Sequence, residues 1–139
     1  MEKDWKNFAI VVLLIVAIVN GYLFIDTKSK LQEAQRYTYV AVESQLSYLA
    51  HNTKLILEYW DDINIAASRR IEQQYTIARE VLWSHGFAPQ STFMTHYYST
   101  VSHVLDKIES GERTPELKAE VQMIYNDLSF LASQCRDTK

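Results

Sequence analysis

The feature that most constrains this chain is an apolar run from Phe8 to Ile25, close to its amino end. These eighteen residues carry no charge, and Asn20 is their one strongly polar side chain. As an α-helix the run would be roughly 27 Å long, close to the hydrocarbon thickness of a bilayer, about 30 Å. We therefore predict a transmembrane helix over residues 8–25, a short tail over residues 1–7, and a soluble domain over residues 26–139.

A signal peptide and an interfacial helix both fit the run less well. A cleavable signal peptide has a shorter apolar core of about 7–15 residues followed by small residues, whereas this run ends in the bulky residues Tyr22, Leu23 and Phe24. An interfacial helix would show a charged face, and this segment has none. The run is typical of an uncleaved signal anchor in the cell membrane, with the lipid bilayer as its first partner.

The charges on either side of the run do not determine its orientation. Lys3 and Lys6 precede it and Lys28 and Lys30 follow it, so the positive-inside rule favours neither side. Because only seven residues precede the run, we expect this tail in the cytoplasm and the soluble domain outside it.

Three residues within the run suggest a contact with another helix. Ala17 and Gly21 are four residues apart, a spacing at which small side chains let two transmembrane helices approach closely. Asn20 beside them could form a hydrogen bond across such a contact. Alternatively, Asn20 lies among the lipid headgroups and Gly21 is only a small residue near a helix end. We take Ala17, Asn20 and Gly21 as the candidate membrane-helix contact.

The soluble domain begins with a long segment that nothing obliges to break. The 64 residues from Tyr22 to His85 contain no Gly and no Pro. Apolar or small residues recur at steps of mostly three and four, which predicts one helix over about residues 28–85, roughly 87 Å long. The pattern is less regular than the heptads of a two-stranded coiled coil. The positions in this predicted stripe are Leu46, Leu49, Thr53, Ile56, Trp60, Ile63, Ala67, Ile77 and Val81.

A second interpretation places a chain reversal inside that segment. Asp61, Asp62, Ile63 and Asn64 contain residue types that cap helices, and Asp62 or Asn64 could begin a new helix. The continuous helix is our first expectation, because the apolar stripe passes through this site with little disturbance.

Two further helices follow a clear stop at Gly86 and Pro89. Ser91 or Thr92 is expected to cap a helix over about residues 91–109, and Thr114 with Pro115 to begin another over about residues 115–136. Their apolar faces are Phe93, Tyr97, Val101, Val104 and Ile108 in the first, and Leu117, Val121, Ile124, Leu128, Leu131 and Cys135 in the second. The fold class is therefore all-α. The two shorter helices pack back on the long one as a three-helix bundle, or a four-helix bundle if the chain reverses.

Composition argues against several functions. Residues 26–139 hold twelve Lys or Arg and fifteen Asp or Glu, a net charge of −3, which does not suit a nucleic-acid-binding surface. The three glycines of the chain could hardly build a phosphate-binding loop, and no H-E-x-x-H or nucleophile-elbow motif is present. Cys135 is the single cysteine, so no internal disulfide can form. We expect no catalytic activity, no cofactor and no metal.

Tyrosine is the remaining signal. The chain has nine tyrosines, and tyrosine is favoured at protein interfaces. Tyr37 with Tyr39, and Tyr97 with Tyr98, lie too close in sequence for both members of a pair to face one core, so these four residues form our candidate partner surface. We expect a single-pass accessory or scaffolding protein of a bacterial-type envelope that binds another membrane protein or itself. The alternative is an extracytoplasmic helical sensor domain, which would need a ligand cavity between its helices.

Overall fold

A computed structural model describes the backbone of residues 2–137 and the side chains of residues 12–137. Within this range all regular secondary structure is helical and there is no strand. Its elements are α1 (Glu2–Glu58), the 3₁₀ turn η1 (Trp60–Asp62), α2 (Ile65–Ser84), α3 (Ala88–Glu109) and α4 (Pro115–Asp137). The chain divides into two compact units, residues 1–37 and residues 38–139, and α1 contributes to both.

In the first unit the described residues form part of one helix. Residues 2–7, expected as a tail, are already helical in the backbone. From residue 12 to residue 25 every side chain is exposed, including Leu13 at 68% and Phe24 at 70%. By length and composition this part of α1 is able to cross a membrane.

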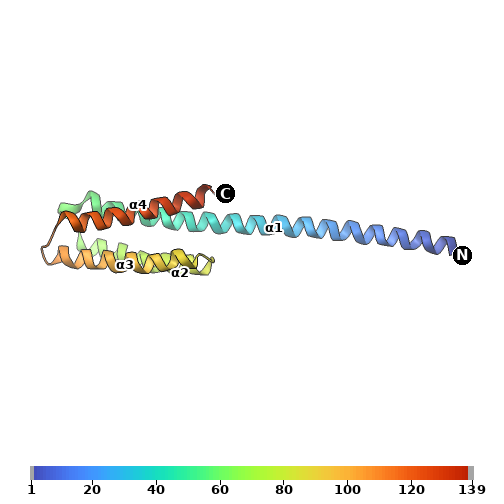
Figure 1. The fold of residues 1–139 in the computed structure, drawn as a ribbon, viewed down its shortest axis with the longest axis horizontal. Coiled ribbons are helices and arrows are strands. Elements are labelled where there is room, and N and C mark those ends of the chain that lie inside the picture. The colour runs from blue at the N-terminus through green and yellow to red at the C-terminus, as the bar shows by residue number, and fades with distance from the viewer. Residues whose placement is uncertain (1, 138–139) are drawn as a thin grey trace. The chain divides into compact units, whose positions relative to one another are not determined.

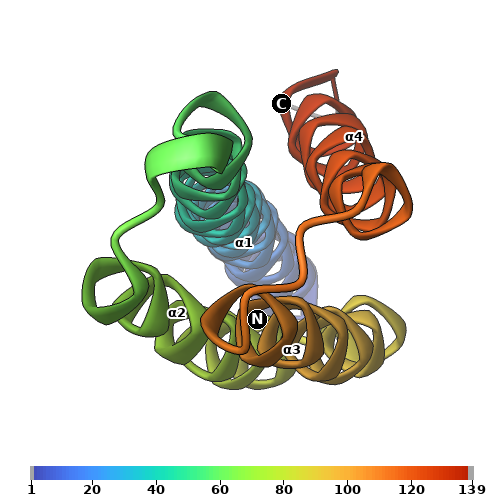
Figure 2. The same ribbon diagram turned by 90° about the vertical axis from the view of Figure 1, so that its left-hand side faces the viewer.

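The second unit is a bundle of four helical segments, comprising residues 38–58 of α1 and the helices α2, α3 and α4. Successive segments run in opposite directions, and α1 and α4 form one layer while α2 and α3 form the other (Figures 1 and 2). The core lies between these layers and includes Leu49, Leu105 and Leu128, each fully buried. Short turns between the helices account for this up-and-down topology.

The continuous helix predicted over residues 28–85 is wrong, and the alternative reversal is present. α1 ends at Glu58, η1 follows, and Ile63 is extended before α2 begins. Asn64 caps α2 because its side-chain oxygen accepts a hydrogen bond of 3.0 Å from the backbone N–H of Ala67. Trp60 and Ile63 are buried at the turn itself. The reversal covers an apolar stripe that a single straight helix would leave in water.

The reversal also changes which face of α2 is buried. A helix continuing the earlier phase would bury Ala67, Ile77 and Val81, but Ala67 and Ile77 are exposed and Val81 is only half-buried. Because the turn contains non-helical residues, α2 is rotated about its axis relative to the stripe predicted for a continuous helix. The buried positions of α2 therefore lie one residue further along the chain than that stripe predicts. The buried positions of α2 are Ser68, Glu72, Tyr75, Ala78 and Leu82.

The stop at Gly86 is confirmed. Gly86 has a φ of 84°, its N–H donates to the Trp83 carbonyl at 3.1 Å, and the N–H of Phe87 donates to the Leu82 carbonyl at 2.8 Å. This pair of bonds is the Schellman arrangement, and the half-buried Phe87 ring packs against the core beside it. Gly111, with a φ of 90°, ends α3 in the same way.

We expect Gly86→Ala to lower the free energy of unfolding of the bundle by about 1 kcal/mol, because a side chain disfavours a positive φ. An added Cβ would meet no atom within 4 Å, so the cost is backbone strain without a clash. Urea unfolding of the full-length protein in detergent, followed by near-UV circular dichroism, measures the change. Ser84→Ala, at an exposed helical position, is the control, with an expected change within about 0.5 kcal/mol. Equal stability of the two variants would contradict the prediction.

The start of α3 differs from the prediction. The helix begins at Ala88, three residues before Ser91, and Pro89 lies in its first turn, where no backbone N–H is needed. Ser91 does not act as the cap: it is buried, and its hydroxyl donates to the Arg79 carbonyl of α2 at 3.1 Å. Phe93, expected on the buried face, is 48% exposed.

The start of α4 agrees with the prediction. The hydroxyl of Thr114 accepts a hydrogen bond of 3.4 Å from the N–H of Leu117, and Pro115 is the first helical residue. The predicted face of α4 is buried except at Leu131, which is half-buried. Regular three- and four-residue spacing without interruption explains why this helix was the easiest to predict.

Polar contacts connect the helices of the bundle. The Tyr75 hydroxyl on α2 and the Thr53 hydroxyl on α1 lie 2.5 Å apart, and Thr53 donates its own proton to the Leu49 carbonyl at 2.8 Å. Tyr75 is therefore the donor to Thr53. Arg69 on α2 pairs with Glu109 on α3 at 3.1 Å and, within α2, with the buried Glu72 at 3.0 Å. In the described part of the chain, no buried side-chain nitrogen or oxygen lacks a hydrogen-bond partner.

Candidate functional site

The candidate membrane-helix contact lies on an exposed face of α1. Ala17, Asn20 and Gly21 are all exposed, and no side chain of the described residues reaches within 4 Å of the position of an added Cβ at Gly21. At 100° per residue the three positions fall within about a third of the helix circumference. This face therefore presents two small residues around one amide, surrounded by apolar side chains, and it is exposed in the part of the chain that the structure describes.

The first tyrosine pair is divided between solvent and core. Tyr37 is 68% exposed, and its hydroxyl donates to Glu33 one turn earlier, at 3.4 Å. Tyr39 is half-buried in the bundle and its ring meets the Phe87 ring edge to face, with centroids 5.6 Å apart and planes at 84°. Of this pair, Tyr37 offers surface to a partner, whereas much of Tyr39 is used in packing.

The second pair is divided in the same way, and Tyr97 is its buried member. Tyr97 is 6% exposed, and its hydroxyl on α3 donates to the carboxylate of Asp127 on α4 at 3.0 Å. Its neighbour Tyr98 is 39% exposed. The reason is helical geometry: adjacent residues point about 100° apart, so one member of the pair faces the core while the other faces outward.

Burial, and then the hydrogen bond to Asp127, raise the pKa of Tyr97 above the usual tyrosine value of about 10. Burial likewise raises the pKa of Tyr75, although the hydrogen bond with Thr53 acts in the opposite direction. Both phenols therefore stay protonated in the folded state at pH values where they ionise in the unfolded chain. Their contribution to stability is complete below about pH 10 and is lost as the pH rises towards the folded-state pKa.

We expect Tyr97→Phe to reduce the alkaline loss of stability. Above about pH 10 each of the two buried tyrosines lowers the free energy of unfolding of the wild type by up to about 1.4 kcal/mol per pH unit, and the variant retains only the contribution of Tyr75. Urea unfolding of the full-length protein on both sides of about pH 10 measures the two slopes. Identical slopes in the wild type and the variant would show that Tyr97 is not responsible.

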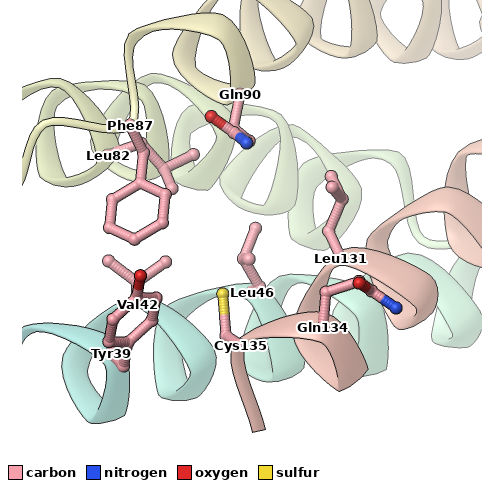
Figure 3. Close-up of a pocket in the computed structure, with 9 residues that line it drawn as sticks. All are labelled: Tyr39, Val42, Leu46, Leu82, Phe87, Gln90, Leu131, Gln134 and Cys135. Atoms are coloured by element: carbon pink, nitrogen blue, oxygen red, sulfur yellow. The ribbon is translucent and has the colours of Figure 1, made fainter. Parts of the chain in front are cut away.

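Sequence reasoning missed a cavity at the end of the bundle that holds Tyr39 and Val42 of α1. The cavity has a volume of about 120 Å³, and Figure 3 shows side chains from all four helices around it. Its apolar wall also includes Leu82 and Leu131, with the rings of Tyr39 and Phe87 on one side. These residues come from three distant parts of the sequence. No local pattern could have brought them together before the reversal between α1 and α2 was known.

Among the described residues, no cluster of three or more His, Cys, Asp or Glu side chains is arranged to hold a metal ion. Near the reversal, Glu58 pairs with Lys54 at 3.0 Å and the carbonyl of Asp61 accepts a hydrogen bond from Arg113. Cys135 is buried beside the cavity and is not part of a disulfide.

Comparisons of the chain with known protein families, with curated proteins and with solved structures found no match.

Proposed function

We propose that this chain is a non-enzymatic, single-pass membrane protein that binds another membrane or envelope protein through its transmembrane and helical segments. The observation that carries the proposal is the exposed apolar surface of α1 from Val12 to Ile25. Exposure of so much apolar surface to water is unfavourable, and large exposed apolar patches mark membrane or protein contacts. A lipid bilayer would provide an apolar environment for this segment along its whole length.

The chemistry of one face of this segment supports a helical partner. Transmembrane helices associate through close packing at small residues and through hydrogen bonds between helices. Ala17 and Gly21 provide the close approach, and the amide of Asn20 between them needs a hydrogen-bond partner in hydrocarbon, where no water is available. A neighbouring helix that approaches this face would provide that partner. Tyr37 and Tyr98 add exposed aromatic surface for further contacts.

We place the bundle on the extracytoplasmic side. The apolar segment near the amino end then acts as a signal anchor. A membrane-impermeant thiol reagent tests this on intact cells, using Asp137→Cys at an exposed position in a Cys135→Ala background. Labelling without cell lysis supports the assignment, whereas labelling only after lysis places the bundle in the cytoplasm.

Photocrosslinking in native membranes tests the partner. A photoreactive residue is placed at Asn20 and, separately, at Ile15, which lies about opposite the candidate face at 100° per residue. We expect a discrete adduct with another protein from Asn20 and little or none from Ile15. A third probe at the exposed Tyr37 examines the helix beyond the membrane segment, because Tyr97 is buried and unsuitable.

Mass spectrometry of the adducts distinguishes the outcomes. A heterologous protein crosslinked from Asn20 and not from Ile15 supports an accessory subunit. Adducts containing only this chain indicate self-association through the same face. Equal lipid adducts from both positions, together with a monomeric purified protein that captures no partner, would contradict the proposed function.

A further inference from the structure

The cavity at the end of the bundle is of a size that binds one small molecule. Its volume is about 120 Å³. An enclosed, engineered apolar cavity of about 150 Å³ in another protein stays dry and binds benzene or xenon. The cavity here is similar in volume and is partly open to solvent. A molecule of one six-membered ring therefore matches the space available here.

The residues that line the cavity determine whether it can bind a charged molecule. None of the side chains around the cavity is Asp, Glu, Lys, Arg or His, so a charged ligand would lose its hydration without gaining an ion pair. Two other hollows of the bundle, of about 240 Å³ and 370 Å³, differ in this respect because Asp62 lines the first and Lys54 and Arg136 line the second. The cavity of about 120 Å³ is therefore suited only to an uncharged molecule.

The aromatic side of the cavity favours a ring. Tyr39 and Phe87 meet edge to face beside it (Figure 3), and such a pair offers a further ring both an edge and a face to pack against. Gln90, half-buried on α3, supplies an amide near the cavity for a ligand hydroxyl or carbonyl.

We propose that this cavity is a binding site for a small, uncharged, single-ring aromatic molecule carrying at most one hydroxyl or carbonyl group. The site is independent of the partner-binding role proposed above, because it is formed by the bundle and not by the membrane segment. It is also the feature that a ligand-sensing domain requires. Since all four helices line it, a bound ring would contact each of them and stabilise the bundle as a whole.

Thermal unfolding of the full-length protein in detergent tests the proposal, with phenol as the probe. We expect phenol to raise the melting temperature in a saturable way, by about 5 °C at ten times its Kd. Benzoate, a ring of similar size that is charged at neutral pH, is expected to give no saturable rise. The absence of a saturable rise with phenol, or equal effects of phenol and benzoate, would overturn the proposal.

Two variants locate the binding site. Leu131→Trp enlarges a half-buried side chain at the cavity wall and is expected to abolish the effect of phenol. Phe130→Trp, at the adjacent position that is 61% exposed, is the control and should respond like the wild type. Both variants are measured in the same micelles, so partitioning of phenol into detergent affects them equally. A full response of Leu131→Trp to phenol would place binding elsewhere and overturn the proposal.

A second measurement does not depend on the folding of a variant. Cys135 lines the cavity and is the single cysteine, so its reaction with a small methanethiosulfonate reagent reports on access to this space. We expect saturating phenol to slow modification of the wild-type thiol at least several-fold, and benzoate to leave the rate unchanged. An unchanged rate at phenol concentrations that raise the melting temperature would overturn the assignment to this cavity.

Discussion

Replacing Leu14 and Ile18 with arginine is expected to prevent stable insertion of α1 into the membrane. Both side chains are exposed, at 58% and 69%, and lie near the middle of the apolar segment, four residues apart on one face. Each substitution exchanges a favourable apolar contribution for an unfavourable charge at the bilayer centre, a change of about 3 kcal/mol per residue and about 6 kcal/mol together. Arginine is a good helix former, so the helix itself should persist.

Alkaline carbonate extraction of membranes, followed by immunoblotting, measures this effect. The wild type should remain in the extracted membrane pellet, and the Leu14→Arg, Ile18→Arg variant should move to the soluble or aggregated fraction. The control is the pair Leu31→Arg and Gln35→Arg, which has the same spacing on exposed positions of α1 beyond the apolar segment. If the first variant resists extraction as well as the wild type, the segment does not span a bilayer.

Tyr75→Ala is expected to lower the free energy of unfolding of the bundle by about 3–5 kcal/mol, whereas Ile77→Ala should change it by less than about 0.5 kcal/mol. Tyr75 is fully buried and its hydroxyl donates to Thr53, while Ile77 is 48% exposed. The first substitution removes a large buried ring and leaves a cavity. Since small proteins are stable by only about 5–15 kcal/mol, the loss would be a large part of the total.

This pair of variants distinguishes the two possible phases of α2. A helix continuing from α1 in the same phase would bury Ile77, and the relative effects would be reversed. Tyr75→Phe, which keeps the ring and removes the hydroxyl, should cost about 1 kcal/mol, the net contribution of one hydrogen bond. Chemical unfolding of the full-length proteins, followed by near-UV circular dichroism, measures all three changes. A greater loss for Ile77→Ala than for Tyr75→Ala would contradict the fold.

Much of this protein could be predicted from local sequence. The apolar segment from Phe8 to Ile25 follows from the lack of charge over a length that matches a bilayer. The helix end at Gly86 follows from the conformational freedom of glycine at a positive φ, and the start of α4 from the residues Thr114 and Pro115. Each of these depends on residues that are neighbours in the chain, so no tertiary contact is needed to recognise them.

The reversal between α1 and α2 depended on tertiary packing. Local sequence did not rule out a continuous helix through Asp61 and Asp62, because no Gly or Pro interrupts the segment and the apolar stripe continues. The broken form is preferred because folding back buries Trp60 and Ile63 and covers the core of the bundle. This stabilisation depends on packing against α3 and α4, which are distant in sequence from the turn.

The consequences of the reversal were equally beyond local sequence. It rotates α2 so that Tyr75 and Ala78 are buried while Ile77 is exposed, and it contributes Leu82 to the cavity that Leu46 of α1 also lines. Likewise, the hydroxyl of the buried Tyr97 has a partner only because α4 brings Asp127 within hydrogen-bond distance. The sequence by itself determined the helical class, the apolar segment, the helix stop at Gly86 and the start of α4. Only the tertiary structure decided which faces meet and where space remains between them, since both depend on contacts between distant residues.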